Sequence, residues 1–145
     1  MFFQDVKFRH IHFSFPLIVF VCSGYLLLQK SGGLQIIIYN IVFFLVTLLL
    51  LITYMSLKNR QYINPFKNYF GIGDVAFYIS ITPIFLLNNY IIFFIMSLLF
   101  ALVMQFIFVK NKKASTVPLA GFASLLLVLL IISDLTMVTQ PFTTL

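Results

Sequence analysis

The sequence predicts an all-α, polytopic membrane helix bundle with about five transmembrane helices, and its composition is the first reason. Of the 145 residues, 62% are hydrophobic and only 8% are charged, and the mean hydropathy is +1.11. A soluble domain of this size lacks the polar surface to cover so many apolar side chains, whereas a lipid bilayer removes that requirement. The apolar runs are also continuous and longer than the alternating segments of about 10 residues that a membrane β-barrel uses.

Five apolar runs predict the five membrane spans. They cover roughly residues 13–28, 34–57, 72–87, 90–109 and 117–133. Each run approaches the length of about 20 residues that crosses a bilayer as a helix. Pro83 predicts a kink in the third run, and the pair Asn88-Asn89 predicts the turn that ends it. The chain has no internal repeat and no low-complexity linker, so residues 1–145 are expected to form a single membrane-embedded domain.

The basic residues predict the orientation of this bundle. In a five-span chain the N-terminus, the second loop and the fourth loop share one side of the membrane. These segments hold Lys7, Arg9, Lys58, Arg60, Lys67, Lys110, Lys112 and Lys113, whereas the first loop holds only Lys30. The positive-inside rule therefore predicts a cytoplasmic N-terminus in the inner (cytoplasmic) membrane. Because the charges are scattered among loops, membrane topology explains them, and no nucleic-acid partner is expected.

The three acidic residues are the candidate chemical groups. The chain has no Glu, and its only Asp residues are Asp5, Asp74 and Asp134. Asp5 precedes the first run and Asp74 opens the third, so two crossings return the chain to the same side, whereas Asp134 ends the fifth run on the opposite side. Two neighbouring carboxylates in a low-dielectric site share one proton, so the ionised member can activate water while the protonated member donates to a scissile carbonyl. Asp5 and Asp74 are therefore a candidate catalytic pair.

Two glycines precede the second candidate acid, and simpler roles for both acids remain open. Gly71 and Gly73 lack side chains, so they would let a substrate backbone approach Asp74 closely, and they are the candidate substrate-binding residues. Asp74 is equally suited to capping the first turn of a helix. Asp5 is equally suited to being a solvated charge near a chain terminus.

Three segments carry a family resemblance. Gly71-Ile72-Gly73-Asp74 resembles the G-x-G-D signature of intramembrane aspartyl peptidases, and of the type IV prepilin peptidase (prepilin leader peptidase) family in particular. The segment 5–13 is similar to that family's first motif, D-x-[KR]-x-R-x-I-P-[ND], at Asp5, Lys7, Arg9 and Ile11, with His12 in place of proline. The segment 117–123 resembles the I-P-x-x-P segment that opens a later span in the family, without its second proline.

The resemblance implies an aspartic endopeptidase with Asp5 and Asp74 as its catalytic dyad. Its substrates would be the leader peptides of type IV prepilins or pseudopilins, cut at the cytoplasmic membrane face for pilus assembly or protein secretion. Ala76 stands where the family commonly has Lys. The cysteine-bearing cytoplasmic domain of bifunctional members is absent, so methyltransferase activity is not expected, and neither is a cofactor. A non-enzymatic multi-pass membrane subunit and an inactive homologue that binds leader peptides are the alternatives.

The remaining polar residues are expected to have structural rather than catalytic roles. His10 and His12 have no acidic or cysteine partner nearby in the sequence, so no metal site is expected and solvation at the membrane interface accounts for them. Polar side chains inside the apolar runs are expected to form hydrogen bonds between helices. These are Asn40, Thr47, Thr53 and Gln105.

Overall fold

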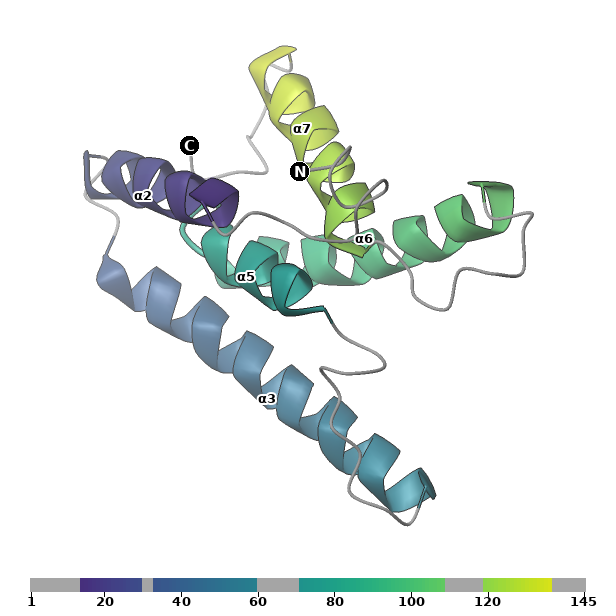
Figure 1. Ribbon diagram of the computed structural model, residues 1–145. Helices are drawn as coiled ribbons and strands as arrows, with labels where there is room; N and C mark the ends of the chain where they lie inside the picture. The colour runs from purple at the N-terminus through teal and green to yellow at the C-terminus, as the bar shows by residue number, and fades with distance from the viewer. Residues whose placement is uncertain (1–13, 30–32, 60–70, 109–118, 137–145) are drawn as a thin grey trace.

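The computed structural model describes residues 14–29, 33–59, 71–108 and 119–136, and within these ranges every regular element is a helix. In chain order the elements are α2 (Ser14–Gln29), α3 (Leu34–Asn59), α5 (Ile72–Ser80), α6 (Leu87–Phe108) and α7 (Leu119–Thr136) (Figure 1). The all-α prediction is therefore confirmed. Four of the five predicted runs agree with a helix to within a few residues at each end.

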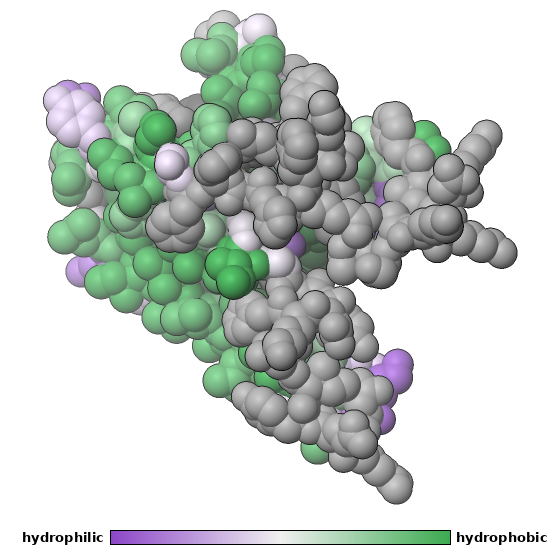
Figure 2. Space-filling view, in the orientation of Figure 1, coloured by the Kyte–Doolittle hydropathy of each residue, from purple (hydrophilic) through white to green (hydrophobic). Residues whose placement is uncertain are grey.

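The outer surface of the helices shows that the chain is a membrane protein. Three helices, α3, α6 and α7, are long and apolar enough to cross a membrane, and α2 is a shorter apolar helix. Large apolar side chains point outward along them, with Leu49 and Leu50 of α3 each 61% exposed. Figure 2 shows hydrophobic residues spread continuously over the side of the molecule formed by α2 and α3. A soluble monomer rarely exposes an apolar surface of this extent, whereas lipid covers it without cost.

The third predicted span differs from a simple transmembrane helix. α5 ends at Ser80 after nine residues, which corresponds to about 13.5 Å of helix, less than half of the roughly 30 Å hydrocarbon core. The chain then turns, and α6 begins at Leu87, so Asn88 and Asn89 lie in the first turn of α6 and the turn predicted there is wrong. The kink predicted at Pro83 is a complete break, because proline lacks an N–H donor and disfavours helical geometry in the residue before it.

The short helix α5 lies among the longer ones and supplies much of the core. It contacts α2, α3 and α7, while α6 packs against α7 and α3 (Figure 1). One face of α5 carries the buried side chains Phe77, Tyr78 and Ile81. The Tyr78 ring lies 5.0 Å from that of Phe94 and 5.5 Å from that of Phe44, centroid to centroid. These aromatic contacts with α3 and α6 fix the position of a helix too short to be held by the membrane alone.

The turn after α5 has irregular backbone that is buried in protein, and a side chain from another helix donates hydrogen bonds to two of its carbonyl groups. Residues 81–85 are buried, so their carbonyl groups need donors from the protein. The Nδ2 amide of Asn40, in α3, donates to the carbonyl oxygens of Thr82 at 2.8 Å and Phe85 at 2.7 Å. Asn40 itself is fully buried. The predicted interhelical hydrogen bonding of Asn40 is therefore confirmed.

The predicted interhelical role is wrong for the two threonines of α3. The Thr47 hydroxyl donates to the carbonyl of Phe43 at 2.9 Å, and the Thr53 hydroxyl donates to that of Leu50 at 2.9 Å. Both acceptors lie three or four residues earlier in the same helix, a common alternative for threonine inside a helix. Gln105 is half-buried in α6, and its interhelical bond stays a prediction.

Hydroxyl groups also donate hydrogen bonds to the backbone carbonyls at the C-terminal end of α5. The Thr82 N–H bonds to the carbonyl of Ile79 at 3.2 Å rather than to that of Tyr78, one residue earlier, and the Thr82 hydroxyl donates to the same Ile79 oxygen at 2.8 Å. The carbonyl of Tyr78 instead accepts the Tyr90 hydroxyl of α6 at 3.0 Å. Side chains thus replace helical donors that are lost where α5 stops.

Candidate functional site

Asp74 is the one sequence-predicted catalytic residue that lies in the described part of the chain. It is the third residue of α5, and 8% of its surface is exposed. Its Oδ2 accepts a hydrogen bond from the backbone N–H of Gly71 at 3.1 Å, and its Oδ1 accepts one from the backbone N–H of Ala120 at 2.7 Å. The Asp74 N–H in turn donates to the Gly71 carbonyl at 3.0 Å. The carboxyl group is therefore held at both oxygens by main-chain donors.

The two donors belong to the first turns of different helices. Gly71 is the N-cap residue of α5, with extended backbone angles, and Ala120 is the second residue of α7. The N–H groups of a first helical turn have no partner within their own helix, and the helix dipole adds partial positive charge there. Two helix N-termini therefore meet at one carboxylate, an arrangement that favours negative charge.

The hydrogen bonds to the ionised Asp74 carboxylate are similar in energy to the cost of burying its charge. Burying one ion in protein costs several kcal/mol after relaxation. Each hydrogen bond to a charged group returns roughly 1.5–3 kcal/mol. The two N–H bonds to Asp74 are together of the same order as the penalty.

The bond from Ala120 to Asp74 joins segments 46 residues apart. It brings the start of α5, where the second loop ends, to the start of α7, where the fourth loop ends. That the two loops lie on one side of the membrane stays a prediction. Small residues make the approach possible, since Ala120 and Ala123 are fully buried one turn apart on α7, and α7 packs against α5.

Ala120 was missed as a site residue by the sequence analysis. Its contribution is a backbone N–H, which every residue except proline possesses, so its residue type carries no signal. The resemblance of the segment 117–123 to a family motif was the one feature of the sequence that pointed to this region; residues 117 and 118 of that segment lie outside the described residues.

The two candidate substrate-binding glycines lie at the exposed start of α5. Gly71 is exposed, Gly73 is half-buried, and Ile72 between them is 70% exposed. A Cβ atom added to Gly71 would lie 3.2 Å from Asp74 Oδ2, tighter than ordinary van der Waals contact. A side chain at position 71 would therefore press on the carboxylate. The absence of a side chain at Gly71 thus matters first for the position of Asp74.

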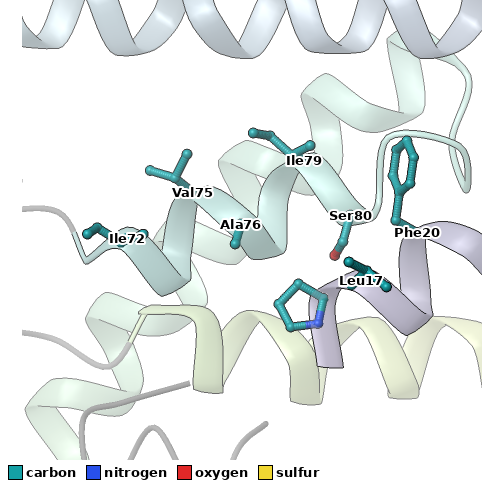
Figure 3. Close-up of a pocket in the computed structure, with 8 residues that line it drawn as sticks. Leu17, Phe20, Ile72, Val75, Ala76, Ile79 and Ser80 are labelled. Atoms are coloured by element: carbon teal, nitrogen blue, oxygen red, sulfur yellow. The ribbon is translucent and has the colours of Figure 1, made fainter. Parts of the chain in front are cut away.

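A groove of about 290 Å³ lies between α2 and α5, beside this site (Figure 3). Its lining is almost wholly apolar and comprises Pro16, Leu17, Phe20, Ile72, Val75, Ala76, Ile79 and Ser80. In Figure 3, Ile72 lies at one end of the row of α5 side chains, and Leu17 and Phe20 lie near Ser80 at the other end.

Asp74 is on the opposite side of α5 from the groove. Groove residues such as Val75 and Ile79 repeat at helical spacing along one face, whereas Asp74 shares its face with the core residues Phe77 and Tyr78. A segment bound in the groove would therefore reach the carboxylate around the N-terminal end of α5.

The other candidate residues are separated from this site or lie outside the description. Asp5, His10 and His12 fall outside the described residues, so the pairing of Asp5 with Asp74 stays a prediction. Asp134 lies 14 residues after Ala120 in α7, which is about 21 Å along the helix axis. Asp134 is therefore far along α7 from the Ala120 N–H that binds Asp74, and its exclusion from the pair stays a prediction. Among the described residues, no group of three or more His, Cys, Asp or Glu side chains could hold a metal ion.

The geometry permits two kinds of role for Asp74, both of which use its negative charge. A carboxylate fixed by main-chain donors can serve as a base toward water, and it can also tie the starts of two helices together. Comparisons of the chain with family models, with curated proteins and with solved structures gave no match.

Proposed function

We propose that this protein is an intramembrane aspartyl endopeptidase that cleaves the leader peptides of type IV prepilin-like proteins, with Asp5 and Asp74 as its catalytic pair. One observation carries the proposal: the Asp74 carboxylate is buried where two helix N-termini meet, in a chain with only three acidic residues. Ionisable residues inside membrane proteins are costly, and they mark functional sites far more often than structural ones. The proposed activity includes no methyl transfer and needs no cofactor.

The length of chain before α2 is sufficient for the proposed pairing. Figure 3 shows the first turns of α2, at Leu17 and Phe20, near the Ser80 end of α5. Asp74 lies near the other end of α5, six residues and about 9 Å along the axis from Ser80. Asp5 precedes Ser14 by nine residues, and nine residues of extended chain reach about 30 Å. Nine extended residues therefore exceed the axial distance between Ser80 and Asp74.

The reaction follows from two carboxyl groups that share one proton. The ionised member removes a proton from a water molecule, whose oxygen attacks the carbonyl carbon of the scissile peptide bond. The protonated member donates its proton to the carbonyl oxygen, which gives a tetrahedral diol. In the proposed site this chemistry takes place at the start of α5, where Gly71 and Gly73 leave room for a substrate backbone.

The groove between α2 and α5 offers the substrate an approach from the membrane. The resemblance implies substrates with a short basic leader, and the groove lining is almost wholly apolar, which suits an apolar segment of a membrane-bound substrate. An apolar segment lying in the groove would place the leader beside Ile72 and the two glycines. The basic loops are consistent with cleavage at the cytoplasmic face of the inner membrane, where the positive-inside rule puts them.

A second candidate function is a non-enzymatic membrane subunit, and one observation favours it. Both oxygens of Asp74 already accept backbone N–H bonds, which is the arrangement of a structural helix cap that joins α5 to α7. An inactive homologue that binds leader peptides would share this cap. In these alternatives the carboxylate contributes to stability alone, so the two functions differ in what happens when its charge is removed.

The test is leader cleavage by the purified protein in lipid vesicles that contain a prepilin-like substrate. Asp5→Asn and Asp74→Asn are each expected to abolish cleavage, because an amide can neither accept nor supply the catalytic proton. Asp134→Asn is the matched control and is expected to cleave normally, since Asp134 lies at the far end of α7.

Equilibrium unfolding of the same variants separates the two candidate functions. An enzyme loses activity in Asp74→Asn while its helices remain assembled, because the Asn oxygen can still accept one backbone N–H. Substantial cleavage by either Asp5→Asn or Asp74→Asn would refute the catalytic pair. A wild-type protein that cuts no leader, with a large loss of stability in Asp74→Asn, would support the structural subunit instead.

A further inference from the structure

We propose that two adjoining grooves beside α2 bind one acyl chain of a membrane lipid, from the leaflet on the side of the first loop. The first is the α2–α5 groove described above, with a volume of about 290 Å³. The second, the α2–α3 groove, has a volume of about 540 Å³ and is lined by side chains of α2 between Phe20 and Leu28 and by Leu34, Ile37 and Ile38 of α3. Phe20 lines both grooves. This lipid site goes beyond the proposed peptidase activity and does not depend on it.

The lining of both grooves suits a hydrocarbon ligand. In the α2–α5 groove, Ser80 is the one polar side chain among the described lining residues, and its hydroxyl donates to the carbonyl of Phe77 in its own helix at 2.7 Å. In the α2–α3 groove, the Tyr25 hydroxyl accepts a hydrogen bond from Gln29 Nε2 at 3.0 Å. A polar ligand would leave its hydrogen-bonding groups unsatisfied against such a lining, which is costly. An acyl chain brings no polar group with it.

The packing of α3 on α5 fixes the level of the α2–α5 groove along α3. Asn40 of α3 donates to the carbonyl of Thr82, just after α5, at 2.8 Å. One turn later in α3, the Phe44 ring lies 5.5 Å from the ring of Tyr78, one turn earlier in the chain, centroid to centroid. The two helices are therefore antiparallel, and each step toward the end of α3 corresponds to an equal step toward the start of α5.

This pairing places the α2–α5 groove near the middle of the bilayer. Continued by two residues, it makes Ala76, in the middle of the groove, level with Val46, in the middle of α3. The exposed rings of Tyr39 and Tyr54 lie at nearly equal distances on either side of Val46 along α3. Exposed tyrosines of membrane helices gather at the two membrane–water interfaces. The groove therefore lies at the depth of acyl chains, away from lipid headgroups and water.

The α2–α3 groove extends from this level to the first loop. Phe20 lies near Ser80 (Figure 3), at the end of the α2–α5 groove that faces the start of α3. The far end of the α2–α3 groove is at Leu28, next to the end of α2, and at Leu34, the first residue of α3. From Leu17 to Leu28 the two grooves follow α2 for 11 residues, which is about 16.5 Å. This length matches the roughly 15 Å that one leaflet contributes to the hydrocarbon core.

The shape and surroundings of the grooves favour an acyl chain over a helix of a partner protein. The grooves run along different neighbours of α2 and share Phe20, so an occupant of both must bend, which a flexible chain does and a rod about 10 Å wide does not. Leu17 and Leu28 in their lining are exposed, and Figure 2 shows that this side of α2 and α3 is continuous apolar surface. Acyl chains are the most abundant apolar groups at such a surface, so mass action favours them. A chain in the grooves also restores dispersion contacts that an unfilled gap lacks.

One consequence concerns the proposed peptidase. There the apolar segment of a substrate would displace the acyl chain from the α2–α5 groove, so lipid and substrate would compete. This consequence rests on the proposed function, whereas the lipid site rests on the grooves alone.

Fluorescence quenching tests the site in an intact bilayer. The chain has no Trp, so one introduced Trp reports on its own surroundings. Phe20→Trp keeps an aromatic ring where the grooves adjoin, and Val46→Trp is the matched control, exposed to lipid on α3 and outside both grooves. Each variant is placed in phosphatidylcholine vesicles with or without bromine near the ends of the acyl chains. We expect both to be quenched by the brominated lipid. Quenching of Val46→Trp alone would overturn the proposal.

A second substitution separates a chain in the grooves from lipid passing over the surface. Ala76→Phe fills the α2–α5 groove, so the end of the acyl chain can no longer lie there. Combined with Phe20→Trp, it is expected to remove most of the quenching, and combined with Val46→Trp to leave quenching unchanged. Leu49→Phe adds an aromatic ring to the exposed surface of α3 instead and is expected to change neither signal. Unchanged quenching of Phe20→Trp in the presence of Ala76→Phe would show surface lipid only and would overturn the site.

The measurement also stands if Ala76→Phe does not assemble, because Ala76→Leu fills the same groove with a smaller side chain and has the same expected direction. Neither fluorescence signal depends on cleavage. Quenching as expected in a protein that cuts no leader would therefore keep the lipid site and overturn the peptidase, and active protein without the quenching would do the reverse.

Discussion

The two ends of α5 are stabilised by different chemistry. At the C-terminal end, neutral groups satisfy the backbone: the Asn40 amide binds two carbonyl groups of the turn, and the Tyr90 hydroxyl binds a third. At the N-terminal end, a carboxylate binds the N–H groups of Gly71 and Ala120. One short helix thus has neutral donors at one end and a charged acceptor at the other.

The two ends therefore differ in charge. The N-cap of α5 is Gly71, which has no side chain to accept a hydrogen bond, and the acceptor is the carboxylate of Asp74, the third residue of the helix. The C-terminal end shows that this fold does satisfy buried backbone with neutral groups. The carboxylate at position 74 is the charged group on which the proposed catalytic role depends.

The largest effect on stability is expected at the neutral end, from Asn40→Leu. The substitution removes both donors from the Thr82 and Phe85 carbonyls, which are buried away from water. Losing a hydrogen bond to a buried backbone carbonyl costs about 1 kcal/mol, and up to about 3 kcal/mol where no other donor remains. The change also removes the Asn40 Oδ1 atom, which is buried with no hydrogen-bond partner among the described residues, and this offsets part of the loss. We expect a net loss of about 2–4 kcal/mol in equilibrium unfolding in mixed detergent micelles.

Thr47→Val is the matched control for this variant, because Thr47 is in the same helix and bonds within it. Its stability should change by less than about 1 kcal/mol, since the Phe43 carbonyl keeps its place in the helix. If Asn40→Leu were as stable as the control, the buried turn would not depend on α3. The contrast between the two ends of α5 would then be lost.

A smaller effect is expected from Tyr90→Phe, which removes one hydroxyl from the same end of α5. The ring stays in the aromatic core, while the Tyr78 carbonyl loses the donor that replaces its helical partner. One neutral hydrogen bond corresponds to about 0.5–1.5 kcal/mol of stability. The measurement is the same unfolding equilibrium. Leader cleavage should fall less than twofold, and a loss of cleavage as severe as in Asp74→Asn would contradict the separation of the two ends.

The sequence predicts the helical part of this fold well because bilayer thickness sets the length of an apolar run. The runs at residues 34–57 and 117–133 agree with α3 and α7 within three residues at each end. The break in the third run was harder to predict, because apolar residues continue through it on both sides of Pro83. Pro83 interrupts the helix, but the buried turn that follows also depends on a tertiary interaction: Asn40, 42 residues before Thr82, donates to its carbonyl.

Only the side-chain components of the candidate site could be predicted from the sequence. Asp74 stands out in a chain with three acids, and its glycine neighbours stand out with it. The second donor to the carboxylate is a main-chain group from α7, and nothing in the identity of Ala120 distinguishes it from other small residues in a helix. The face of α5 that carries Asp74 was also not predicted, because apolar residues occupy both faces: Val75 and Ile79 line the groove, while Phe77 and Tyr78 lie in the core with Asp74.

The smallest effect on stability, and the sharpest test of the charged end, is expected from Gly71→Ala. Gly71 has a backbone φ of −70°, which alanine adopts freely, so the gain from a less flexible unfolded chain offsets the poorer N-cap, and stability should stay within about 0.5 kcal/mol. The new Cβ lies 3.2 Å from Asp74 Oδ2 and must displace the carboxylate by a few tenths of an ångström. Because a shift of about 1 Å in a catalytic group can cost a hundredfold in rate, leader cleavage should fall about threefold to tenfold.

Gly24→Ala is the control, since a Cβ at Gly24 meets no atom within 4 Å, and it should cleave like the wild-type protein. Unchanged cleavage in Gly71→Ala would show that the position of the carboxylate does not limit the reaction, and Asp74 would then be a cap like those at the other end of α5.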